Sequence, residues 1–128
     1  MTHATPLLTR LLFPLTRSSF AQGCIGWVFA HMTFALPVQR LRETDTLIAF
    51  YHPRPAYPVH VLLVPRKAIP GLAELSPADQ PFVADVFRVV QDLVAELQLE
   101  SKGYRLIVNG GAYQDVKQLH FHLVSGSA

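Results

Sequence analysis

Residues 103–124 read GYRLIVNGGAYQDVKQLHFHLV, and this stretch decides the fold. An apolar run, YRLIV, leads into a glycine-rich turn, and the stretch ends in QLHFHLV. Because side chains alternate between the two faces of a strand, Gln118, His120 and His122 are expected to share one face, while the apolar residues between them share the other. The pattern therefore predicts a sheet that packs one face on a core and presents two histidines on the opposite face.

Outward from this ending, short strand patterns alternate with turns. We expect strands over residues 38–42, 46–51, 59–64, 104–108 and 118–124. Pro53, Pro55 and Pro58 prevent regular pairing, so they predict an extended loop between the second and third strands. Because most connections are turns, the strands are expected to be mainly antiparallel neighbours.

One long helix is predicted after residue 75. Ser76 is the expected N-cap, Pro77 suits the first helical position, and Asp79 sits in the first turn. The apolar residues at helical spacing form one stripe, namely Phe82, Val86, Val89, Val90, Leu93 and Leu97. The residues expected on the solvent side are Asp85, Arg88, Asp92 and Glu96. The pattern indicates an α+β fold with a mainly antiparallel sheet of about five strands, one long helix and a short helix.

The amino-terminal part of the chain differs in composition from the rest, because every acidic residue lies at Glu43 or later. We predict helices over residues 5–16 and 18–35, and hence an extra N-terminal helical extension of residues 1–37 followed by a domain of residues 38–128. The apolar run within the extension is too short to span a bilayer. Packing of these helices on the domain is the main interpretation, and contact with a membrane surface is the alternative.

Bulk properties exclude several classes of protein. The chain has 128 residues, of which 50% are hydrophobic, as expected for a globular domain. Its formal net charge of +2 provides no general field for nucleic acid. The single cysteine, Cys24, rules out an internal disulfide framework and fits a reducing compartment. We therefore expect a cytoplasmic protein without a nucleic-acid partner, and peripheral membrane association is the alternative location.

The histidine pair indicates phosphoryl chemistry. A histidine can attack phosphorus at neutral pH because its imidazole is largely uncharged near its intrinsic pKa of about 6.5. Attack by His120 gives a reactive N-phosphoryl imidazolium, which divides one hard displacement into two easier steps. The charge on the phosphoryl oxygens needs hydrogen-bond donors, for which His122, Gln118 and Asn109 are candidates. Gly111, in the glycine-rich turn, lets backbone N–H groups approach an anion.

The same residues fit two other interpretations. A His-x-His pair in a strand can be two half-exposed histidines with no role, or two ligands of a zinc ion. His60 and His52 are the candidates for further zinc ligands. The leading interpretation requires neither a metal nor another cofactor.

Residues 103–124 resemble the carboxy-terminal motif of the histidine-triad (HIT) nucleotide hydrolases and transferases. That motif reads His-x-His-x-His and usually follows Asn-x-Gly and a Gly-Gln-Ser/Thr-Val loop. Residues 46–69, TLIAFYHPRPAYPVHVLLVPRKAI, resemble the family's strand, proline-containing loop, histidine strand and Pro-basic-basic turn. The likeness covers about residues 38–125. It implies a HIT-like fold, a nucleotide substrate, and a homodimer that pairs through the long helix and the adjoining strand.

The resemblance also implies roles for individual residues. His120 matches the family's nucleophile, His122 matches the third histidine of the triad, and His60 matches an upstream histidine that supports the site. Asn109 and Gln114 match polar residues on the phosphate-binding side. The family motif therefore selects the same nucleophile as the strand pattern does.

Three positions depart from the family pattern. Gln118 replaces the first histidine of the triad; it can still donate a hydrogen bond to a phosphoryl oxygen, but it cannot carry a positive charge. Asp115 stands where Ser or Thr usually assists the leaving group, and its charge is unfavourable beside a phosphate unless the carboxyl is protonated, turned away or bound to a cation. His52 replaces an aspartate that commonly binds the ribose hydroxyls. Arg54 nearby is either a solvated loop residue or a contact for a second phosphate or a carboxylate.

We therefore expect an enzyme, a hydrolase or nucleotidyl transferase that acts on a nucleoside phosphoryl bond through a covalent nucleotidyl-His120. The expected substrates are phosphoramidates, acyl-nucleotides or dinucleoside polyphosphates. A catalytically weak nucleotide-binding module and a His-His metal-binding protein are the alternatives.

Overall fold

The computed structural model describes residues 40–127, so the predicted helices over residues 5–16 and 18–35, and the proposed 1–37 extension, lie outside the described residues. One five-stranded sheet has the order β1-β2-β3-β5-β4, and every neighbouring pair is antiparallel. The strands are β1 (Arg40–Glu43), β2 (Leu47–Tyr51), β3 (Val59–Pro65), β4 (Arg105–Val108) and β5 (Phe121–Ser125). The predicted antiparallel α+β architecture is confirmed.

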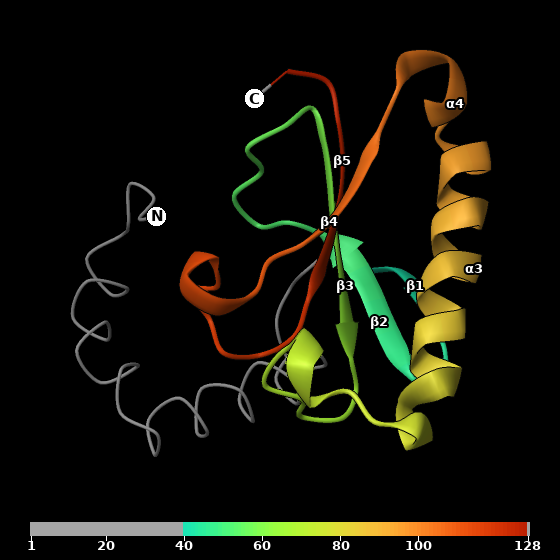
Figure 1. Cartoon of the computed structure of the whole chain (residues 1–128). Coiled ribbons are helices and arrows are strands. Elements are labelled where there is room, and N and C mark those ends of the chain that lie inside the picture. Colours follow the sequence, from blue (N-terminus) through green and yellow to red (C-terminus); the bar gives the residue numbers. More distant parts are fainter. Residues whose placement is uncertain (1–39, 128) are drawn as a thin grey trace.

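A single long helix, α3 (Gln80–Glu96), covers one face of the sheet (Figure 1). It follows the short 3-10 helix η2 (Pro77–Asp79) and precedes the short helix α4 (Leu99–Lys102). Ser76 begins the helical region as predicted, because its backbone N–H donates to the Asp79 carboxylate at 3.0 Å. The sequence signals at residues 76–79 therefore mark the true start, although the first turn is 3-10 rather than α. Within residues 40–127, no helix is long and apolar enough to cross a membrane.

The main core lies between α3 and the sheet. The predicted helix stripe is buried there, with Leu97 at its edge only partly buried, and it contacts the apolar residues of β5, Phe121 and Leu123. A second, smaller cluster lies on the opposite face of the sheet and consists of Ile48, Phe50, Leu62 and Val64. The two faces of the sheet thus differ: one packs on the helix, and the other carries the second cluster beside the histidines.

Two local predictions were wrong. Asp85 is not simply solvated on the outer side of the helix, because it accepts hydrogen bonds from the hydroxyls of Thr46 at 2.6 Å and Thr44 at 3.0 Å and so ties α3 to the start of β2. The predicted strand over residues 118–124 begins only at Phe121. Continuing the β3–β5 register brings Pro65, which has no N–H, opposite Leu119, whose own N–H donates instead to the Ile69 carbonyl at 2.7 Å.

Candidate active site

The histidines gather on the sheet face opposite α3. In β3 and β5, Leu62 pairs with His122, and His60 pairs with Val124, so both histidines project from the same face. The ring centroids of His60 and His122 are 5.2 Å apart, and those of His122 and His120 are 4.9 Å apart. The alternation that the sequence predicts for His120 and His122, and the convergence of His60, are therefore confirmed by the geometry.

The hydrogen bonds of His60 determine which ring nitrogen carries its proton. The backbone N–H of Ala56 donates to His60 Nδ1 at 3.0 Å, so Nδ1 is an acceptor. The proton of the uncharged ring is then on Nε2, which donates to His122 Nδ1 at 3.0 Å. His122, as the acceptor, carries its own proton on Nε2. Through the ring of His60, the Ala56 N–H thus determines that the proton of the His122 ring is on Nε2.

In His120, Nδ1 is the hydrogen-bond donor, whereas in His60 and His122 it is the acceptor. Nδ1 of His120 lies 2.7 Å from the carbonyl oxygen of Gln118, and because a carbonyl can only accept, this Nδ1 must be the donor. In the uncharged ring the lone pair is therefore on Nε2. A backbone contact two residues away along the chain thus determines which nitrogen of His120 carries the proton.

Burial keeps both imidazoles uncharged. Burial, together with the smaller electrostatic effect of the nearby His52, lowers the pKa of His60 from 6.5 to about 4. Burial also lowers the pKa of His120, partly opposed by the hydrogen bond to the Gln118 carbonyl. At neutral pH, both rings are therefore in the form that has a lone pair.

Gln118 has an unusual environment for a polar residue. Its side chain is only 1% exposed, and its amide nitrogen, Nε2, has no hydrogen-bond partner among the described residues. A buried amide N–H group without an acceptor costs about 1–3 kcal/mol. The residue therefore holds two unused donors immediately before β5.

The residues predicted on the phosphate-binding side are only partly brought together. Continuing the β4–β5 register, in which Ile107 pairs with His122, brings Asn109 beside His120. Gly111 has φ +58°, a left-handed conformation that favours glycine. Gln114 is committed elsewhere, because its buried amide donates to the Pro70 carbonyl at 2.7 Å. Asp115 follows it in the same loop and is half-buried.

His52 lies at the end of the histidine row. Its ring centroid is 4.4 Å from that of His60 and 6.4 Å from that of His122. Its Nδ1 accepts a hydrogen bond from the backbone N–H of Arg54 at 2.9 Å. Tyr57, which sequence reasoning missed, packs edge-on against His60 with ring centroids 5.5 Å apart. No periodic pattern marks Tyr57, because it lies in the proline-containing loop.

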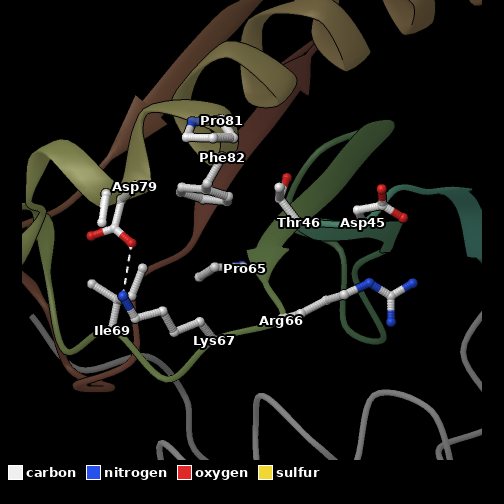
Figure 2. Close-up of a pocket in the computed structure, with 10 residues that line it drawn as sticks. Asp45, Thr46, Pro65, Arg66, Lys67, Ile69, Asp79, Pro81 and Phe82 are labelled. Atoms are coloured by element: carbon white, nitrogen blue, oxygen red, sulfur yellow. Dashed lines mark hydrogen bonds and ion pairs between the residues drawn. The ribbon is translucent and has the colours of Figure 1, made fainter.

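A separate pocket lies between the start of β2, the end of β3 and the beginning of α3 (Figure 2). It contains none of the predicted site residues, and both of its basic side chains have partners. Lys67 lies 3.0 Å from the Asp79 carboxylate, and the Nε of Arg66 donates to the Thr44 carbonyl at 2.6 Å. Among residues 40–127, no three His, Cys, Asp or Glu side chains are grouped so that they could hold a metal ion.

Comparisons with known proteins agree with this arrangement. The sequence profile of the HIT domain matches residues 34–128. A HIT-like protein of Chlamydia pneumoniae is 34% identical over 90 residues, which are 69% of this chain and 81% of that protein. A HIT family hydrolase from Clostridium thermocellum has a TM-score of 0.70 at 34% identity, over 77% of this chain and 89% of that chain. The histidine triad nucleotide-binding protein from Candida albicans has a TM-score of 0.69 at 26% identity, over 79% and 75%.

The expected HIT-like fold is thus confirmed independently by sequence and by tertiary structure. Because the match extends over most of the chain, the protein belongs to the HIT family.

Proposed function

We propose that the protein cleaves or transfers a nucleoside monophosphate group through a covalent nucleotidyl-His120 intermediate. One observation carries the proposal: His120 Nδ1 donates to the Gln118 carbonyl, which leaves the lone pair on Nε2 of a ring whose pKa is lowered by burial. Similarity to a protein described as a hydrolase and to one described as nucleotide-binding supports the same class of reaction.

The proposed reaction has two balanced steps. Nε2 of His120 forms a bond to phosphorus, and the bond from phosphorus to the leaving group breaks. For a phosphoramidate, the amine leaves with the bonding electron pair and takes up a proton from solvent. Water then forms a new P–O bond, the N–P electron pair returns to Nε2, and the proton lost by water replaces the one consumed earlier. In a transferase, an acceptor hydroxyl or phosphate replaces this water.

Three neighbouring residues are proposed to stabilise the phosphoryl oxygens. His122 carries an N–H on Nε2, because its Nδ1 accepts from His60. Gln118 offers an amide that is buried without a partner among the described residues. Hydrogen bonds to anionic oxygens are stronger than those between neutral groups, so a bound phosphate repays the cost of burying this amide. Asn109 is the third proposed donor. Gly111 and Asp115 belong to the proposed phosphate side. Gln114 supports the loop that carries them, because its amide donates to the Pro70 carbonyl.

The test replaces His120 with Gly and measures turnover of adenosine 5′-phosphoramidate and of an acyl-adenylate. We expect a loss of about a thousandfold or more in kcat, because removal of a nucleophile leaves only binding and positioning. Rapid quenching of the wild-type reaction should yield protein heavier by one adenylyl group, attached at His120. A Gln91→Ala variant, altered at an exposed position of α3, serves as the control with unchanged turnover. Undiminished turnover in the His120→Gly variant, or adenylyl attached to another residue, would contradict the proposal.

The departures at Gln118, Asp115 and His52 favour a second candidate, a nucleotide-binding module with little turnover. Calorimetry separates the two, because the module predicts AMP binding by the wild-type protein without turnover of any substrate in the panel. The His-His zinc interpretation has less support, since no three potential ligands are grouped among the described residues.

We also propose that the protein forms a homodimer in the cytoplasm. β4 is at one end of the sheet, so its outer edge is not paired with another described strand. Phe87 on α3 is 55% exposed, which provides apolar surface on the element that the resemblance implicates. Sedimentation of the full chain should give twice the 14.3 kDa mass of one copy. A monomer at all concentrations would contradict dimerisation, and membrane contact of residues 1–37 stays a separate prediction.

A further inference from the structure

The turn that follows β5 packs closely on the loop between β2 and β3 (Figure 1). Val59 is opposite Ser125 in the β3–β5 ladder. The residues just beyond this end of the ladder, Pro58 and Gly126, are therefore brought together. A Cβ on Gly126 would lie 2.7 Å from Cγ and 2.8 Å from Cδ of Pro58, whereas ordinary contacts are 3.4–4 Å. The Pro58 ring therefore occupies the space that any side chain at position 126 would need.

Neither residue continues the ladder in the usual way. Pro58 has no N–H to donate, and Gly126 has φ +91°, a left-handed conformation that favours glycine. The loop is therefore placed against β5 by the packing of a rigid ring on bare backbone. Such a contact leaves little freedom, because a proline ring cannot rotate away as a long flexible side chain can.

The position of Pro58 determines the position of the Ala56 N–H. The pyrrolidine ring fixes φ of Pro58, and the residue before a proline, here Tyr57, is restricted to extended conformations. A displacement of Pro58 is therefore passed on to Ala56 rather than absorbed between them. The Ala56 N–H donates to His60 Nδ1 at 3.0 Å. A shift of about 0.5 Å at Ala56 would bring this distance to the limit for a hydrogen bond.

The Ala56 N–H excludes the alternative arrangement of protons in the His60–His122 pair. In that arrangement both protons are on Nδ1, His122 donates to His60 Nε2, and the His60 Nδ1 proton points at the Ala56 N–H. Two donors cannot form a hydrogen bond with each other, so the close approach of Ala56 disfavours this arrangement. If the Ala56 N–H moves away, both arrangements become accessible.

We propose that the contact between Gly126 and Pro58 is a positioning contact, which keeps the proton of the His122 ring on Nε2. It acts through the Ala56 N–H and the His60 ring. The inference rests on the proposed function in one respect, because the role proposed for His122 is to donate from Nε2 to a phosphoryl oxygen. In the alternative arrangement Nε2 has a lone pair, which repels an anionic oxygen. A side chain at position 126 would thus weaken catalysis through the loop rather than through contact with the substrate.

Three variants of the full chain separate this contact from a general loss of stability. Gly126→Ala adds the methyl group that the Pro58 ring excludes. Gly103→Ala is the matched control, because Gly103 has φ +88° but a Cβ there would meet nothing within 4 Å. Backbone strain is thus similar in the two variants, and only the first has the close contact. In the double variant with Gly126→Ala and Pro58→Ala, the added methyl group takes the place of Cγ and Cδ of the removed ring.

The measurement is NMR of the imidazole nitrogens at about pH 7.5, which distinguishes nitrogens that carry a proton from those that have a lone pair. Variants with His60→Asn and His122→Asn assign the signals. In the wild type and in Gly103→Ala, we expect both rings to carry the proton on Nε2. In Gly126→Ala, the Nδ1 and Nε2 signals of both rings should move toward each other, because both arrangements are populated. The wild-type pattern should return in the double variant.

Turnover gives a second measurement for the same variants. Complete loss of one donor to a developing anionic oxygen costs about a hundredfold or more in kcat. Because Gly126→Ala weakens such a donor only in part, its kcat should be about tenfold lower than that of Gly103→Ala, with KM changed less than about twofold.

Four results would overturn the inference: protons on Nδ1 in the wild type, a wild-type spectrum in Gly126→Ala, an equal change in Gly103→Ala, or no recovery in the double variant. The spectra require no substrate, so failure of the proposed function is distinguishable. In that case the variants change the spectra as expected, while the wild type turns over no nucleotide.

Discussion

Acidification should destabilise this protein through His60, and the matched variant His60→Asn should lack that response. The pKa of His60 is about 4 in the folded chain, against 6.5 for the ordinary side chain. Because the folded value is the lower one, protons bind preferentially to the unfolded chain. The stabilisation is therefore fully present above about pH 6.5 and is lost as the pH falls from there toward about 4.

The magnitude follows from these two values. A difference of one pKa unit corresponds to about 1.4 kcal/mol, so at about pH 5 the loss attributable to His60 is about 2 kcal/mol, rising toward about 3 kcal/mol near pH 4. Two causes add: burial of the ring, which is the larger, and the electrostatic effect of His52 beside it. Protonation also requires His60 Nδ1 to give up the hydrogen bond from the Ala56 N–H.

The assay is urea unfolding of the wild type and of His60→Asn at about pH 7.5 and about pH 5, with the free energy of unfolding extrapolated to water. An Asn side chain keeps an acceptor for the Ala56 N–H but does not titrate. His120 and the carboxylates change equally in both proteins, so they cancel in the comparison. The wild type should lose about 2 kcal/mol more than the variant. Equal losses in the two proteins would refute the reasoning, because the acid response would then come from other groups.

Three other changes have expected outcomes. Gln118→Leu removes an amide that is buried without a partner among the described residues. The free energy of unfolding should therefore rise by about 1 kcal/mol in urea titrations, while KM for nucleotide increases. A fall in both quantities would contradict the proposed role. Leu93→Ala, at a fully buried position of the helix stripe, should cost about 2–5 kcal/mol, against less than about 0.5 kcal/mol for the control Gln91→Ala at an exposed position of the same helix. Gly126→Ala should lower the free energy of unfolding by about 1–3 kcal/mol, because φ is +91° and a Cβ would lie 2.7 Å from Pro58. An unchanged free energy in urea titrations would mean that the turn relaxes without cost.

Local sequence patterns were sufficient to predict which face a side chain occupies and where an element begins, when these depend on a single strand or helix. The alternation in QLHFHLV correctly separates the helix-packed face from the histidine face. Ser76 marks the helical start, and the proline-containing segment after His52 is the loop between β2 and β3. The strand boundaries were less accurate, because they depend on partners: β5 starts at Phe121 since Pro65 cannot extend the ladder.

The contacts of individual polar side chains could not be predicted in the same way. Asp85 has a helix position that faces solvent by periodicity, yet hydroxyls from the turn before β2 and from its edge reach it. Gln114 was expected at the phosphate side, but its amide is used by the Pro70 carbonyl, 44 residues earlier. The sequence predicts Gln118 as a donor on the histidine face, but only packing buries its side chain almost completely. In each case the partner lies on another element, so no local pattern records it.

The sequence by itself determined that His120 and His122 share a face and that phosphoryl chemistry suits them, because strand periodicity and the type of side chain are local properties. The tertiary structure alone decided which nitrogen of each ring carries the proton. The Nδ1 of His60 accepts a hydrogen bond from the Ala56 N–H, so the proton of its ring is on Nε2. That Nε2 donates to His122, which is 62 residues away in the sequence. The physical reason is that an imidazole has two nearly equivalent nitrogens, and only the groups that folding brings to them make the two different.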